Sequence, residues 1–260
     1  MGFLKGKKIL ISGISNEKSV AFGIFEAMSK QKAELGLICQ NKKIINKIKP
    51  LVPDVPSNLF FSCDVSNDNS IKELFYNVRN VWKKFDGFVH AIAYCPRKQL
   101  SDNFINHINK VDFNITNEIS VYSFLAMIKE CKDMLNKDSS LLTLTSIGAQ
   151  QVVSNYNLMG IAKASLESSV RYIASILGKY YIRVNAISCG PVRTRSSYVI
   201  KNFNQFKKNC KSRAFIKKDI TSLDIGNIAS FLSSNLSKGI TGSIIYVDHG
   251  FHASRKNGLI

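Results

Sequence analysis

The sequence predicts an α/β protein built on one doubly wound parallel sheet of about seven strands. Short apolar segments without polar alternation recur along the chain, which is typical of strands buried on both faces. Segments of helical periodicity lie between them, so strand and helix alternate. The chain has 260 residues, of which 45% are hydrophobic, and can bury a full core without an interrupting linker. We therefore expect residues 1–260 to form a single domain.

The first strand, turn and helix are predicted at the amino end. Residues 8–12 (KILIS) indicate a buried strand, Gly13 a turn, and a helix follows from about Ser19. Next we expect a second strand at 34–40. A lysine-rich helix near 41–49 follows and ends at a group of prolines. Further strands are expected at 59–65, 87–93, 140–145, 183–188 and 243–247, and further helices near 70–84, 104–110 and 113–135.

A long helix is predicted over 155–177, because apolar residues recur there at near-helical spacing. Tyr156 and Lys163 are seven residues apart in it, which places them on one face, about 10 Å apart along the axis. A nearby cation favours the phenolate and makes proton donation by the phenol easier. Taken alone, such a pair is more often a half-buried phenol and a solvated charge. The rest of the chain favours the chemical interpretation.

The first turn has features of a dinucleotide site, although it does not match the G-x-G-x-x-G pattern. Gly13 permits a tight turn, and a helix that begins near Ser19 offers N–H groups and a hydroxyl to a pyrophosphate. The alternative is a plain turn with Ser19 as the helix cap. Gln40 ends the second strand, where such sites recognise the adenosine ribose. Its amide can bind a 2′-hydroxyl but has no charge for a 2′-phosphate, so NADH is favoured over NADPH.

Asp64 follows the third strand. Its carboxylate either accepts a hydrogen bond from the adenine amino group or caps the helix that follows.

Composition narrows the classes of partner. Thirty-six Lys and Arg residues against 18 Asp and Glu give a formal charge of +18. The lysines are spread along the chain without an arginine-rich block, so we attribute them to codon bias and expect no nucleic-acid partner. The six cysteines occur singly, which indicates a reduced cytosolic compartment and no metal site. We expect no signal peptide, and no apolar segment reaches the ~20 residues that span a bilayer.

Several segments, in the right order, resemble the short-chain dehydrogenase/reductase superfamily. More narrowly, the chain resembles the bacterial NADH-dependent enoyl-acyl-carrier-protein reductases of type II fatty acid synthesis, over essentially its whole length. The Tyr-x6-Lys spacing is the most specific feature, because ordinary members of the superfamily have Tyr-x3-Lys. The resemblance rests on MGFLKGKKILISGIS, SVAFGI, the strand end at Gln40, CDV at 63–65, WKKFDGFVHAIA at 82–93, NYNLMGIAKASLE at 155–167, RVNAISCGPVRT at 183–194 and GSIIYVDHGF at 242–251.

The resemblance implies a Rossmann-like fold, NADH as cofactor, an acyl carrier protein that presents the substrate, a homotetramer and a bacterial cytoplasmic location. It assigns catalysis to Tyr156 and Lys163, and it places Cys95 and Tyr156 at the substrate. The residues it assigns to the nucleotide are Gly13, Ser19, Val20, Gln40, Asp64, Val65, Ile92, Lys163, Val192, Arg193, Thr194, Arg195 and Ser196. The chain departs from the family at Ser146, where a second tyrosine is usual.

The mechanism implied is hydride transfer to the β-carbon of a trans-2-enoyl thioester. Tyr156 would hydrogen-bond the thioester oxygen and Lys163 would hold the nicotinamide ribose. The alternatives are a carbonyl or 3-oxoacyl reductase, which the six-residue gap disfavours, and a non-catalytic dinucleotide-binding module.

Residues 192–222 are polar and are predicted to form a lid over the site. Some of the basic residues in this segment are expected to steer the acidic carrier protein. The alternative is a solvated charged loop. The basic residues are Lys201, Lys207, Lys208, Lys211 and Arg213.

Overall fold

Seven parallel strands form one sheet in the computed structural model, which describes residues 2–254. The strand order is β3-β2-β1-β4-β5-β6-β7. This confirms the predicted doubly wound parallel sheet. The strands are β1 (Lys8–Ser12), β2 (Glu34–Cys39), β3 (Phe60–Ser62), β4 (Phe85–His90), β5 (Leu135–Thr145), β6 (Arg183–Cys189) and β7 (Ile244–Val247).

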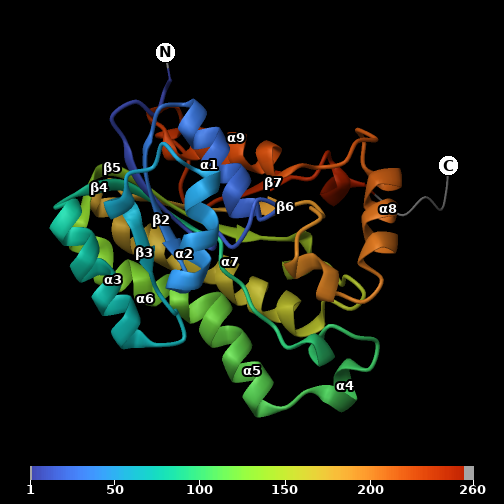
Figure 1. The fold of residues 1–260 in the computed structure, drawn as a ribbon. Coiled ribbons are helices and arrows are strands. Elements are labelled where there is room, and N and C mark those ends of the chain that lie inside the picture. Colours follow the sequence, from blue (N-terminus) through green and yellow to red (C-terminus); the bar gives the residue numbers. More distant parts are fainter. Residues whose placement is uncertain (1, 255–260) are drawn as a thin grey trace.

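Helices cover both faces of the sheet (Figure 1). Helices α1 (Val20–Lys30), α2 (Lys42–Ile48) and α9 (Ser222–Ser233) pack on one face, and α3 (Asp68–Val81), α6 (Ser123–Cys131) and α7 (Asn157–Leu177) pack on the other. The remaining helices lie near the carboxyl ends of the strands or beside α7, and they are α4 (Phe104–His107), α5 (Lys110–Asn117) and α8 (Phe203–Arg213).

Polar side chains mark where several of these helices begin. The side chains of Ser19, Asn41 and Asn67 accept hydrogen bonds from first-turn N–H groups of α1, α2 and α3. Thr221 and Asp224 form a reciprocal capping box at the start of α9. Such caps satisfy N–H groups that have no partner within the helix, and each stabilises it by about 1 kcal/mol.

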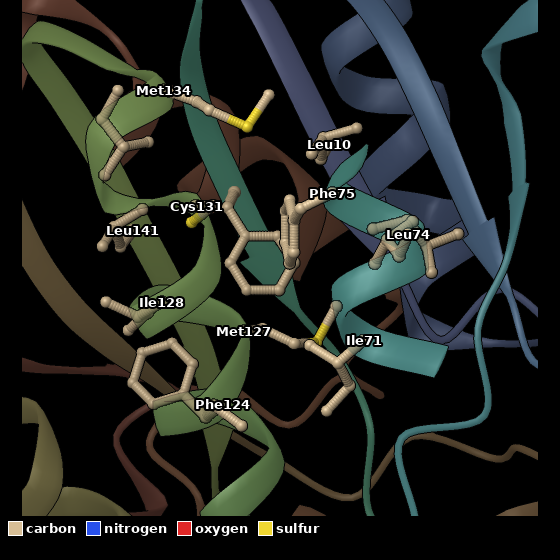
Figure 2. Close-up of a cluster of buried hydrophobic side chains, with 14 of the residues drawn as sticks. Leu10, Ile71, Leu74, Phe75, Phe124, Met127, Ile128, Cys131, Met134 and Leu141 are labelled. Atoms are coloured by element: carbon tan, nitrogen blue, oxygen red, sulfur yellow. The ribbon is translucent and has the colours of Figure 1, made fainter. Parts of the chain in front are cut away.

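The two faces have separate apolar cores. Figure 2 shows the core under α3 and α6, where Phe75, Phe124 and Met127 belong to one cluster of buried side chains. Phe124 and Met127 are fully buried. Burial of a side chain of this size stabilises the fold by about 2 kcal/mol, so these helices are held firmly against the strands that carry the site.

Two helices differ from the sequence prediction. The helix expected over 113–135 is divided into α5, a π-helical turn at Glu118–Tyr122, and α6. Helix α9 was not predicted, although Ile225, Ala229 and Leu232 have helical spacing and are fully buried. Among residues 2–254, no helix is long and apolar enough to cross a bilayer.

Candidate active site

The strand order reverses between β1 and β4, and the chain turns sharply there. Gly13 follows β1 with φ +88°. A Cβ at this position would lie 2.1 Å from the carbonyl oxygen of Ala91, which follows β4. A side chain is therefore excluded by both conformation and space. In doubly wound sheets, ligands bind at this reversal, outside the carboxyl ends of the strands.

A cavity of about 570 Å³ follows the carboxyl ends of β1 to β4. Polar side chains are among its lining residues, and it reaches the amino end of α1, as a dinucleotide site requires. Most of the predicted nucleotide residues line this nucleotide cleft: Gly13, Ser19, Val20, Gln40, Asp64, Val65, Ile92, Lys163, Thr194 and Ser196.

Local hydrogen bonds define two of these residues further. The Ser19 hydroxyl accepts from the N–H of Phe22 and donates to the carbonyl of Asn16, so its side chain caps α1 while the residue lines the cleft. Asp64 accepts from the N–H and hydroxyl of Ser66. The cap of α3 is Asn67, so the alternative in which Asp64 caps that helix is wrong.

A second cavity of about 390 Å³ opens beside the nucleotide cleft. Its walls are mostly apolar, and Cys95, Tyr156 and Val192 are among them. We name it the acyl cavity, because the family resemblance assigns Cys95 and Tyr156 to the substrate. Other apolar side chains that line it are Leu100, Met159, Ile200, Phe203, Phe206 and Phe251. Lys163 and Thr194 line both cavities, so the polar cleft and the apolar cavity meet at these residues.

Tyr156 lies immediately before α7, which begins at Asn157. Its phenol lines the acyl cavity, and burial raises its pKa to about 12. The pKa of the free phenol is therefore raised, contrary to the expectation that a neighbouring cation favours the phenolate; the hydroxyl of Ser146 lowers this pKa, but removal from water outweighs that effect. The phenol remains protonated at neutral pH and can donate a hydrogen bond.

Lys163 is buried on the first half of α7, with 5% of its surface exposed. Its Nζ donates a hydrogen bond of 2.8 Å to the carbonyl of Leu144 at the end of β5. Burial lowers the pKa of Lys163 to about 8, which nearby Cys189 and Glu167 partly oppose. One N–H of the ammonium is occupied, and the others remain for a ligand in the cleft.

Ser146 lines the acyl cavity near Tyr156. Its hydroxyl oxygen is buried and has no hydrogen-bond partner among the described residues. Cys95 is also buried in this wall, and burial raises the pKa of its thiol to about 11. Cys95 therefore acts as an apolar wall rather than as a nucleophile.

Two predicted nucleotide residues do not face either cavity. Arg193 and Arg195 are exposed, and Arg193 donates to the side-chain oxygen of Asn204. In contrast, the prediction did not include the aromatic residues of α8. Phe203, Phe206 and Cys210 recur at helical spacing within a polar segment, and this stripe was the available signal for an element that faces a cavity.

Comparison with known proteins gives consistent similarities. The family model described as Enoyl-(Acyl carrier protein) reductase matches residues 13–252. The chain is 60% identical over 260 residues to "Enoyl-[acyl-carrier-protein] reductase [NADH] FabI" of Buchnera aphidicola subsp. Schizaphis graminum, with all of both chains covered. It is 44% identical over 259 residues to the protein of the same name from Escherichia coli, with 100% of this chain and 99% of the relative covered.

Solved structures agree with these sequence matches. The enoyl-[acyl-carrier-protein] reductase (NADH) of Aquifex aeolicus has a TM-score of 0.92 at 36% identity, over 96% of this chain and 98% of its own. The reductase of Anaplasma phagocytophilum in complex with NAD has a TM-score of 0.92 at 34% identity, over 99% and 96%.

Proposed function

The chain belongs to the enoyl-(acyl carrier protein) reductase family, and we propose that Tyr156 and Lys163 carry its reaction where the two cavities meet. The activity is the NADH-dependent reduction of the trans-2 double bond of an enoyl thioester in fatty acid synthesis. The observation that carries the proposal is the shared position of Lys163, which borders both the nucleotide cleft and the acyl cavity that holds Tyr156.

The residues of the nucleotide cleft fit NADH. Gln40 ends β2 and lines the cleft, where its amide can bind a ribose 2′-hydroxyl. The N–H of Phe22 is bonded by Ser19, so the first-turn N–H groups of Val20 and Ala21, which line the cleft, would bind the pyrophosphate. Lys163 would hold the nicotinamide ribose hydroxyls. When bound, the nicotinamide supplies the hydride that goes to the β-carbon of the substrate.

Tyr156 acts on the substrate as a hydrogen-bond donor. As hydride reaches the β-carbon, negative charge develops on the thioester oxygen. The Tyr156 phenol is protonated, because burial raises its pKa to about 12, and can donate to that oxygen. Lys163 adds positive field in a site from which water is largely excluded. Protonation at the α-carbon then completes the reduction.

The segment 192–222 is proposed as the lid of the acyl cavity. It contributes Ile200, Phe203, Phe206 and Cys210 to the cavity wall, partly through α8. Its outer surface is basic, which suits an acidic carrier protein that delivers the acyl chain through this side. Lys207 and Lys211 already pair with Asp219, at 3.6 and 3.5 Å.

Lys208 is exposed, and no carboxylate of residues 2–254 lies within ion-pair distance of it. It is therefore the lysine of this group most available to the carrier.

A homotetramer is proposed from the family resemblance. Apolar side chains that remain exposed on α5 and α7 support it: Val111, Phe113, Ile161, Tyr172 and Ile176. Such surfaces mark protein interfaces when they are contiguous. Light scattering coupled to size exclusion would measure the mass directly. A cytoplasmic location is also proposed, supported by six free cysteines.

The test of the proposed function compares two thioesters. NADH oxidation should proceed with crotonyl thioester and be negligible with acetoacetyl thioester. Preference for acetoacetyl thioester would indicate a carbonyl reductase, and inactivity with both, with NADH binding intact, would indicate a binding module.

A further inference from the structure

Glu167 is a buried carboxylate that the reaction described above does not use. It lies one helical turn after Lys163 on α7, with 5% of its surface exposed. One carboxylate oxygen accepts from the hydroxyl of Thr145 at 2.8 Å and the other from the amide of Gln150 at 3.1 Å. Burial of a carboxylate is costly even when it is hydrogen-bonded. The presence of a buried carboxylate at this position therefore needs a functional explanation.

The contacts of Glu167 and Lys163 form a matched pair. Lys163 donates to the carbonyl of Leu144, while Glu167 accepts from Thr145, the next residue of β5. Consecutive turns of α7 are thus attached to consecutive residues at the carboxyl end of β5. Together the two hydrogen bonds fix the rotation of α7 about its axis and its position along that axis at the site.

Glu167 also holds the segment that leads from β5 to Tyr156. Gln150 belongs to this segment, and its amide nitrogen donates to Glu167. Its amide oxygen accepts from the Tyr246 hydroxyl of β7 at 2.6 Å. The segment is therefore held from the helix on one side and from a strand on the other. A shift of the segment would break at least one of these two hydrogen bonds, of which the one to Glu167 is partly buried.

Charge gives Glu167 a second effect on Lys163. Burial lowers the pKa of Lys163 to about 8, and Cys189 and Glu167 raise it. Two further groups are relevant to the ammonium: His90 from β4, whose pKa its charge helps to lower, and Tyr156, which lines the same cavity. Burial raises the pKa of Cys189 and of Tyr156 to about 12 and lowers that of His90 to about 3. These three are neutral near pH 7, so the negative charge that favours the ammonium comes from Glu167, which acts through space rather than through a direct ion pair.

We propose that Glu167 is a positioning residue for Lys163, which it orients against β5 and keeps protonated toward the nicotinamide ribose. The proposal rests on the role proposed for Lys163 and extends it to a residue outside both cavities. It treats Glu167 as the counter-charge that allows a buried ammonium to remain charged near neutral pH.

The test uses Glu167→Gln, which preserves shape and removes the charge. The pKa of Lys163, followed by NMR of labelled lysine carbons, should fall by about one unit. NADH affinity, measured by fluorescence titration, should weaken several-fold more at about pH 8 than at about pH 6.5, because the variant loses the ammonium at lower pH. Gln150→Ala keeps the charge, and Glu26→Gln removes an exposed carboxylate on α1. Neither control should move the Lys163 titration.

The proposal is overturned if the Lys163 titration and the pH dependence of NADH binding are unchanged in a folded Glu167→Gln protein. Should that variant be too unstable to study, Lys163→Met and the double variant keep the proposal testable. Glu167→Gln should lower the free energy of unfolding less in the Lys163→Met protein than in the wild type. If the two substitutions lower it additively, the coupling between the two side chains is rejected. If Lys163→Met alone binds NADH normally, the role proposed for Lys163 fails instead.

Discussion

The ring of Tyr156 packs so closely on Gly148 that the glycine has no room for a side chain. A Cβ at residue 148 would lie 2.4 Å from Cδ1 and 2.8 Å from Cε1 of the ring. Gly148 belongs to a short 3₁₀ turn, Ile147–Ala149, that follows β5. The position of the phenol is therefore set by backbone contact, as well as by the start of α7.

Gly148→Ala should displace the phenol and lower kcat between about ten- and a hundredfold, because small misplacements of a catalytic group have effects of that size. Gly178→Ala is the matched control, since a Cβ there meets nothing within 4 Å. Steady-state kinetics and thermal unfolding of both variants would check this. Full activity of Gly148→Ala would show that the phenol tolerates displacement.

Tyr156→Phe should lose about 3 kcal/mol of transition-state stabilisation, or about a hundredfold in kcat and kcat/KM, and bind NADH normally. Ser146→Ala should lose little of either kinetic constant. The Ser146 hydroxyl makes no hydrogen bond of ordinary geometry among the described residues, and its effect on the pKa of Tyr156 is smaller than that of burial, so its loss should change little. If Ser146→Ala is the more damaging change in a folded protein, the serine performs the role assigned to the tyrosine.

The Lys163 ammonium should make the free protein less stable below pH 8 than above it. Burial lowers the pKa of Lys163 from 10.5 to about 8, so between these values the unfolded chain binds more protons than the folded one. The free energy of unfolding should therefore rise with pH over this window, by about 3 kcal/mol from this group. Denaturant titrations of the wild type and of Lys163→Met would show it. An identical pH dependence in both proteins contradicts the prediction.

NADH should bind more tightly than NADPH, because Gln40 lines the nucleotide cleft and has no charge for a 2′-phosphate. Fluorescence titration with both nucleotides would measure the preference. Lys42 and Lys43 are exposed on α2 and do not line the cleft. Their replacement by Gln should leave NADPH affinity unchanged, and a large loss would mean that one of them binds the phosphate.

Reversal of Lys207 and Lys208 to Glu should raise KM for carrier-linked substrate several-fold and spare the coenzyme A thioester. Lys208→Glu alone should account for most of the effect, since Lys207 is 3.6 Å from Asp219. Lys72→Glu on α3, also exposed, serves as the charge control. If the substitutions change KM equally for both substrates, these lysines do not dock the carrier protein.

Local patterns were sufficient to predict the sheet. Each strand is apolar on both faces, and each intervening helix has its own periodicity, so the doubly wound order followed from short segments alone. The prediction failed where a pattern was interrupted or short. The helix expected over 113–135 contains a π-helical turn, Glu118–Tyr122, and α9 was missed despite its Thr221 capping box.

The sequence by itself determined the Tyr156 and Lys163 pair, the glycine turn and the family resemblance, because these depend on residue identity and spacing. Only the tertiary structure decided how these residues behave. Burial raises the pKa of Tyr156 and lowers that of Lys163, and burial depends on distant segments that pack around a side chain. Likewise, the contact of Glu167 with Thr145 joins residues 22 positions apart, and no local periodicity encodes such a contact.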